Sequence, residues 1–241
     1  MAGPHDVSEA SRIPVLYEDN HLLVVVKPVN MPTQEDDSRD PDLLSVLKAD
    51  LKHRHGKPGN VYLGLVHRLD RPVGGVMVFA KTSKAASRLS DAVRTRELDK
   101  TYIAVVHGKP GRPQDTLRHW LRKDTRTNTV SVVKPGAADA KEAVLDYRTL
   151  GSADGLCLLQ IKLHTGRPHQ IRVQLAAIGC PLYGDQRYGS DVNKVGQQLA
   201  LWSTRLSFEH PTLKETLAFT SLPPEQHPWF LWSELIRDLP Q

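Results

Sequence analysis

The chain is poor in cysteine, and this scarcity limits what it can be. Only two cysteines occur among 241 residues, and neither has a second cysteine or a histidine at the spacing of a zinc site. The sequence therefore argues against a bound metal and against a disulfide-stabilised fold. Cys157 lies in an apolar run and Cys180 follows a glycine, so both are expected to be buried, inert thiols in a reducing compartment.

Long apolar runs are also missing. No run approaches the length of a membrane-spanning helix, and residues 1–12 lack the apolar segment of a signal peptide. We expect a cytoplasmic protein without a membrane partner, with a flexible tail over residues 1–12 and one domain over 13–241. A chain of this length can bury a core without disulfides or metals.

Basic residues modestly outnumber acidic residues. Lysine and arginine number 32 against 27 acidic residues, which gives a formal net charge of +5. The basic residues concentrate over 88–100, 118–126 and 162–172, where aromatic and histidine side chains are interleaved. Each cluster alone reads as a solvated face. Three clusters in one small protein favour a nucleic-acid partner.

Apolar periodicity indicates a mixed α+β fold. Short β-branched or alternating runs predict strands over residues 21–27, 61–66, 76–80, 102–107, 130–134, 143–150, 159–163, 199–203, 206–209 and 216–220. Helical spacing predicts helices over about 43–51, from a cap at residue 82 or 83 to about 93, over 170–178, and through 229–236. We find no internal repeat and no low-complexity linker, so one catalytic unit with two possible lobes is the simplest arrangement.

The segment HRLDRP at residues 67–72 carries the first chemical signal. Its single carboxylate, Asp70, lies between two arginines in a loop that joins two apolar runs. Loops held by rigid strands commonly carry function. The alternative is an aspartate that only accepts loop hydrogen bonds or neutralises Arg68, and these residues alone do not decide between the two.

The segment TGRPHQIR at residues 165–172 carries the second signal. A turn leads into a helix on which Ile171, Leu175 and Ile178 share one face, and Arg172 projects off that face. An arginine there could clamp a distant carboxylate in a two-point pair, or the helix start could hold an anion. Phosphate contact by an exposed basic loop is the simpler alternative.

Together these segments resemble the RluA-like family of RNA pseudouridine synthases. The resemblance includes HRLD at 67–70, the runs KTYIAVVHG at 100–108 and TGRPHQIR at 165–172, Gly184-Asp185, and LSFEHP at 206–211. The opening YEDN at 17–20 and Lys27-Pro28 also match. The likeness thus runs from about residue 13 to about 224 in the family's order.

The resemblance implies the pseudouridine synthase fold, a mixed, largely antiparallel β-sheet with flanking helices, and an isomerase that acts on uridine in rRNA or tRNA. Asp70 would be the essential carboxylate, Tyr102 the active-site tyrosine and Arg172 the partner of the aspartate. The reaction detaches uracil from C1′ at N1, rotates it and rejoins it through C5, so it asks for no metal or organic cofactor.

RNA contact is implied for the polar side chains around these residues. The target base must be flipped out of its stack, and Arg68 would fill the space that the base leaves. The residues expected to contact RNA are His67, Arg68, Arg71, Arg167, His169 and Gln170. The small S4 RNA-binding domain of many relatives is expected to be absent, and a monomer is expected.

Two departures and two rival hypotheses accompany the resemblance. Gly74 stands where the family usually has serine, and Gln174 where a histidine is frequent, which puts substrate contacts in question. A catalytically idle RNA-binding protein of the same fold would need basic residues but no carboxylate among them. A glycosidase would usually need two facing carboxylates, and only Asp70 stands out here.

Overall fold

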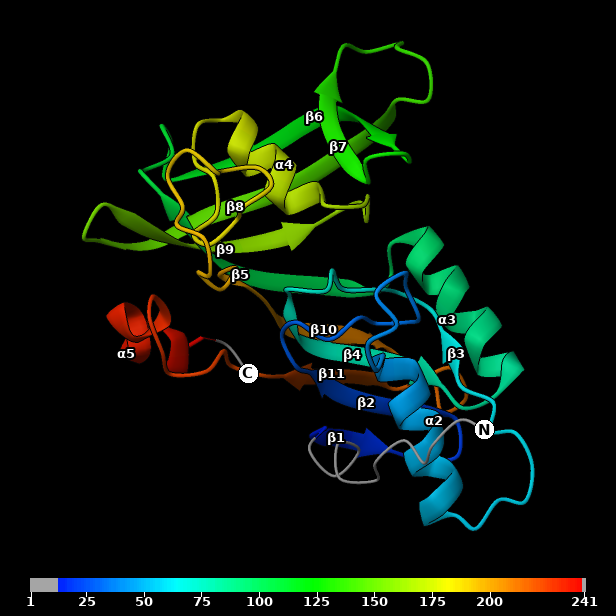
Figure 1. Ribbon diagram of the computed structural model, residues 1–241. Coiled ribbons are helices and arrows are strands. Elements are labelled where there is room, and N and C mark those ends of the chain that lie inside the picture. Colours follow the sequence, from blue (N-terminus) through cyan, green and yellow to red (C-terminus); the bar gives the residue numbers. More distant parts are fainter. Residues whose placement is uncertain (1–12, 240–241) are drawn as a thin grey trace. The chain divides into compact units, whose positions relative to one another are not determined.

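The computed structural model describes residues 13–239, which form two compact units (Figure 1). Residues 13–98 and 206–221 belong to the first unit, and residues 99–205 and 222–239 to the second. Strand β10 (Leu201–Glu209) belongs to the second unit as far as Arg205 and to the first unit from Leu206 onward. The tail expected over residues 1–12 lies outside the described residues.

The first unit is built on a small sheet with two helices. Its strands are β1 (Val15–Glu18), β2 (Leu22–Lys27), β3 (Gly64–Leu65), β4 (Gly74–Ala80), the end of β10 and β11 (Thr216–Thr220). The pairs β1–β2, β2–β4 and β3–β4 are antiparallel. Its helices are α2 (Leu43–Arg54), which Asp42 caps, and α3 (Ser83–Thr95), which Thr82 caps.

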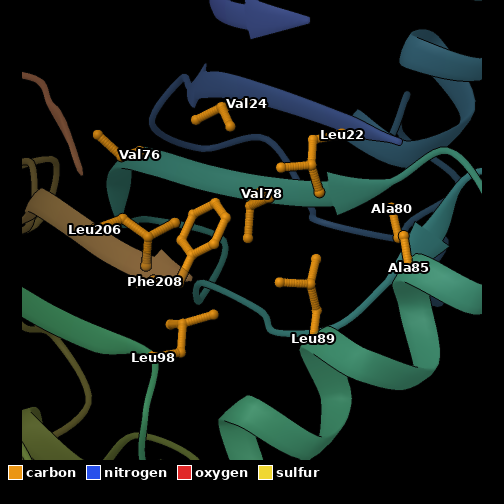
Figure 2. Close-up of a cluster of buried hydrophobic side chains, with 10 residues drawn as sticks. All are labelled: Leu22, Val24, Val76, Val78, Ala80, Ala85, Leu89, Leu98, Leu206 and Phe208. Atoms are coloured by element: carbon orange, nitrogen blue, oxygen red, sulfur yellow. The ribbon is translucent and has the colours of Figure 1, made fainter. Parts of the chain in front are cut away.

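The core of the first unit lies between its sheet and α3. Alternate residues of a strand point to the same face, so β2 and β4 present every second apolar side chain to the helix. Figure 2 shows Val76, Val78 and Leu89 among the ten side chains of this cluster. The cluster contains Leu22, Val24, Val76, Val78, Ala80, Ala85, Leu89, Leu98, Leu206 and Phe208.

The second unit is built on a longer run of mostly antiparallel strands. Its strands are β5 (Asp99–His107), β6 (Gln114–Asp124), β7 (Thr129–Val133), β8 (Lys141–Ala153) and β9 (Leu156–Leu163), in the order β10-β5-β9-β8-β6-β7. Helix α4 (Gln170–Ala177) packs Val173 against Leu121, Val130 and Ala143 of the sheet. A 3₁₀ turn (Trp229–Trp232) and α5 (Ser233–Arg237) are the last elements of the described residues.

The predicted α+β class with a largely antiparallel sheet is confirmed, and several elements differ in detail. Only Gly64–Leu65 of the strand expected over 61–66 is paired, and the strands expected over 199–203 and 206–209 are one strand, β10. Strands β1 and β6 were not predicted. In β6 the buried Leu117 and Leu121 are four residues apart among charged neighbours, so the apolar alternation is too sparse to read.

Neither cysteine forms a disulfide, and both are buried as expected. Among residues 13–239, no helix is long and apolar enough to cross a membrane.

Candidate active site

The loop that carries Asp70 runs from β3 to β4, and its backbone is fixed at several points. The hydroxyl of Thr33 donates to the carbonyl of Leu69 at 2.8 Å, and the amide of Val73 closes a turn on the carbonyl of Asp70 at 2.9 Å. The imidazole of His67 accepts the amide of Val78 at 3.1 Å. The backbone that carries Asp70 is therefore held in place on both sides of this residue.

Lys27 adds a buried cation to this loop. Its side chain is 0% exposed, and its Nζ donates to the carbonyls of Pro28, Arg71 and Val73 at 2.9, 3.0 and 2.8 Å. Burial lowers the pKa of Lys27 to about 7, and the nearby charge of Asp70 acts in the opposite direction. Two of the three carbonyls belong to residues that follow Asp70, so Lys27 anchors the segment that presents it.

The arginines beside Asp70 lie in different surroundings. Arg68 is exposed. Arg71 donates from Nη1 to Ser38 at 2.9 Å and forms an ion pair with Asp40, so its guanidinium is tied to the preceding loop.

Gly74 and Gly75 follow the loop, and Gly75 has a backbone conformation that favours glycine. Gly75 has a φ of +118°, a value that side-chain-bearing residues rarely adopt, and it lies opposite Lys27 in the β2–β4 register. Gly74 is buried in β4. The departure at position 74 therefore lies inside the strand that follows the loop.

Arg172 lies in α4 of the second unit, where it is paired in a two-point geometry. Its Nε and Nη2 donate to the two oxygens of Asp185, each at 2.8 Å, and the ring of Tyr188 lies 5.2 Å from its guanidinium carbon. Burial alone would raise the pKa of Asp185, but the charge of Arg172 and two backbone amides lower it. Asp185 is therefore held as a carboxylate.

The turn before α4 is stabilised from within. The buried side chain of Gln170 accepts the hydroxyl of Thr165 at 2.8 Å and the amide of Arg167 at 3.0 Å, and donates to the carbonyl of Val144 at 3.1 Å. Gln170 was predicted to bind RNA, but its side-chain amide forms hydrogen bonds that stabilise the turn. The guanidinium of Arg167 donates to the carbonyl of Glu142 at 2.9 Å.

His169 begins α4 in the left-handed conformation, with a φ of +51°. The Tyr188 hydroxyl accepts the amide of Val130 at 2.9 Å and lies 2.7 Å from Nδ1 of His169.

Two further residues complete the predicted set. Tyr102 is buried in β5, opposite Ile161 of β9. Gln174 is fully buried, and its Nε2 lies within hydrogen-bond distance of the carbonyls of Leu117 and Ala143 and of Nδ1 of His119. The departure at position 174 therefore concerns the packing of α4 on its sheet.

The structure divides the predicted residues between the units. The first unit holds His67, Arg68, Asp70 and Arg71, and the second holds Tyr102, Arg167, His169, Gln170 and Arg172. Sequence reasoning missed Lys27 and Asp185. Each had a signal, since Lys27 ends the apolar run LLVVVK and Asp185 follows a glycine in a motif already recognised. No group of three or more potential metal ligands lies together within residues 13–239.

Comparison with known proteins gives concordant matches. The family model described as RNA pseudouridylate synthase matches residues 21–177. An uncharacterised RNA pseudouridine synthase, YhcT of Bacillus subtilis, is 32% identical over 88% of this chain and 68% of its own length. The ribosomal large subunit pseudouridine synthase C of Rickettsia bellii is 32% identical over 73% of this chain and 57% of its own.

A solved structure is similar over nearly the whole chain. The human RNA pseudouridylate synthase domain containing 4 matches with a TM-score of 0.76 and 26% identity, covering 98% of this chain and 97% of that one.

Proposed function

Because this chain belongs to the RluA-type family of RNA pseudouridine synthases, we propose that Asp70 is the carboxylate with which it isomerises uridine, and that its substrate is ribosomal or transfer RNA. The enzyme class follows from the family. The assignment of Asp70 and the choice of RNA substrate go beyond the family and are our proposal. We propose Tyr102 and Arg172 as further catalytic residues.

The fixed loop around Asp70 is the observation that carries the proposal. Hydrogen bonds from the side chains of Thr33 and Lys27 and from the amide of Val73 hold the main chain around Asp70, so the backbone that carries its carboxylate is already ordered. A preorganised nucleophile or base loses little entropy when substrate binds. The negative charge of Asp70 raises the pKa of Lys27 against the larger effect of burial, so the two groups attract each other when both are ionised.

The chemistry needs one ionised carboxylate. The bond from C1′ to N1 breaks, the uracil turns, and C1′ bonds to C5. The proton of C5 is lost, and N1 gains one, so no oxidant or reductant is used. Asp70 can attack the sugar or the base, or remove a proton from the sugar, and each route needs its negative charge. Exposed Arg68 can fill the space left by the flipped base.

Ribosomal RNA is the substrate to test first, because the relative from Rickettsia bellii is named for the large ribosomal subunit. The preference between ribosomal and transfer RNA is decided by a pseudouridine map of total RNA from cells with and without the gene. A site that disappears with the gene identifies the substrate.

The catalytic assignment is tested with Asp70→Asn, which removes the charge at nearly constant shape. The variant should form no pseudouridine above background, while its RNA affinity and unfolding midpoint stay near those of wild type. Asp37→Asn, at an exposed aspartate of the 36–40 loop, is the matched control and should be fully active. Substantial turnover by Asp70→Asn would end the assignment, and RNA binding by an inactive wild-type chain would favour the idle RNA-binding alternative.

A further inference from the structure

We propose, resting on the function above, that Asp185 is a positioning residue of the reaction, which acts by fixing the orientation of Arg172 and cancelling its charge. The two side chains are 0% and 8% exposed, respectively, and they meet through two parallel hydrogen bonds of 2.8 Å. A two-point contact with a planar guanidinium fixes its rotation as well as its position.

Backbone hydrogen bonds fix the carboxylate of Asp185, so it can in turn fix the guanidinium of Arg172. Its Oδ1 accepts the amides of Arg187 and Tyr188 at 3.0 and 3.1 Å in addition to Nη2 of Arg172. These bonds prevent the carboxylate from rotating. They also keep it ionised, because they stabilise its charged form against burial.

The chain around Asp185 is built to hold it in place. The Oδ1 atom of Asn193 accepts the amide of Gly184 at 2.6 Å, and its Nδ2 donates to the carbonyls of Leu182 and Gly189 at 2.9 and 2.8 Å. Gly184 has a φ of +78°, and a Cβ there would lie 2.2 Å from the carbonyl oxygen of Gln198. Only glycine fits beside that backbone, so the turn that aims Asp185 tolerates little change.

The pairing determines which part of Arg172 can meet other groups. A guanidinium has five N–H bonds, and Asp185 uses one on Nε and one on Nη2. The same two bonds fix the direction of the other N–H bonds of Arg172, because the guanidinium is planar and rigid. The ring of Tyr188, 5.2 Å from the guanidinium carbon, supports the same orientation. Loss of Asp185 should therefore affect the chemical step and leave RNA affinity nearly unchanged.

The first experiment compares Asp185→Asn with wild type in the full chain, using an RNA that wild type modifies. We expect a roughly 100-fold fall in the single-turnover rate at saturating enzyme, the size associated with a small misplacement of a catalytic group. The dissociation constant for the RNA should change less than about threefold. Asp191→Asn, at an exposed aspartate of the same segment, is the control and should keep the wild-type rate. Rates are measured at a temperature where circular dichroism shows every variant folded.

A double-mutant cycle of Asp185→Asn and Arg172→Lys tests whether Asp185 acts by positioning Arg172 or only by stabilising the fold. Lysine keeps the positive charge but cannot form the two-point pair. If Asp185 acts through Arg172, adding Asp185→Asn to Arg172→Lys should lower the rate by less than about twofold. Should Asp185→Asn not fold, Asp185→Glu takes its place, since it keeps the charge and shifts the carboxylate, and a loss of at least about tenfold is expected.

Several results would overturn the inference. Asp185→Asn at the wild-type rate, an equal loss in both Arg172 backgrounds, a loss confined to RNA affinity, or a folded Asp185→Glu of full activity each contradicts it while leaving the proposed function standing. A wild-type chain that modifies no RNA overturns both.

Discussion

The buried ammonium of Lys27 should make the stability of this protein depend on pH. Lys27→Met removes the titrating group at similar volume, so the difference in unfolding free energy between wild type and this variant isolates its ionisation. Burial lowers the pKa of Lys27 from 10.5 to about 7. At about 1.4 kcal/mol for each pKa unit, the full effect is on the order of 5 kcal/mol.

The sign follows from proton binding in the two states. Between pH 7 and 10.5 the unfolded chain keeps the proton of Lys27 while the folded chain has released it. Stability rises with pH wherever the unfolded state binds more protons. Wild type should therefore gain on the order of 2–3 kcal/mol relative to Lys27→Met between pH 6 and pH 9, because the penalty for burying the ammonium is progressively relieved.

Urea unfolding at several values of pH, followed by circular dichroism, measures this difference. Lys84→Met, at an exposed lysine of α3, should differ from wild type by a constant amount over the same range. A difference for Lys27→Met that is flat within about 0.5 kcal/mol would refute the lowered pKa. A difference that falls with pH would show that the three carbonyl acceptors stabilise the ammonium more than burial disfavours it.

Two further predictions concern the second unit. Tyr102→Phe keeps the ring and deletes the hydroxyl, so tritium release from C5-labelled uridine should fall sharply with little change in RNA affinity; release at the wild-type rate would leave the ring a stacking role only. Asn193→Ala leaves the amide of Gly184 and the carbonyl of Leu182 without their side-chain partner. Urea unfolding should show a loss of about 2–4 kcal/mol, and a loss below about 0.5 kcal/mol would mean that these groups are satisfied in another way.

Much of the fold could be predicted because its elements have clear local patterns. The apolar faces of α2 and α3 recur at helical spacing, and β2 is a continuous β-branched run ending at Pro28. Strand β6 was missed because its exposed face is strongly charged. The charge pattern suggested RNA there, while the pairing with β7 and β8 that makes it a strand depends on residues elsewhere in the chain.

The site could be predicted only in part, because sequence shows which groups are polar and not what they bind. Gln170 was expected to contact RNA, yet its side-chain amide bonds to two groups of the turn and to the carbonyl of Val144 in β8. The pair between Arg172 and Asp185 joins residues thirteen positions apart across a loop. The family resemblance named Asp70 as the partner of Arg172, and that pairing stays a prediction. No periodicity connects Arg172 with Asp185, so this second carboxylate could not be located from the sequence.

Lys27 and Arg172 are both buried, and burial disfavours a charged side chain. Their different partners determine the pH range in which each group can change its ionisation. Lys27 donates to three neutral carbonyls, and burial lowers its pKa to about 7. Arg172 instead meets a carboxylate, and the pKa of Asp185 is lowered by that contact despite burial. A lowered carboxyl pKa gives stability that is complete above about pH 4 and lost only in acid. Between pH 6 and 9 the pair of Arg172 and Asp185 therefore stays ionised, whereas Lys27 titrates within that range.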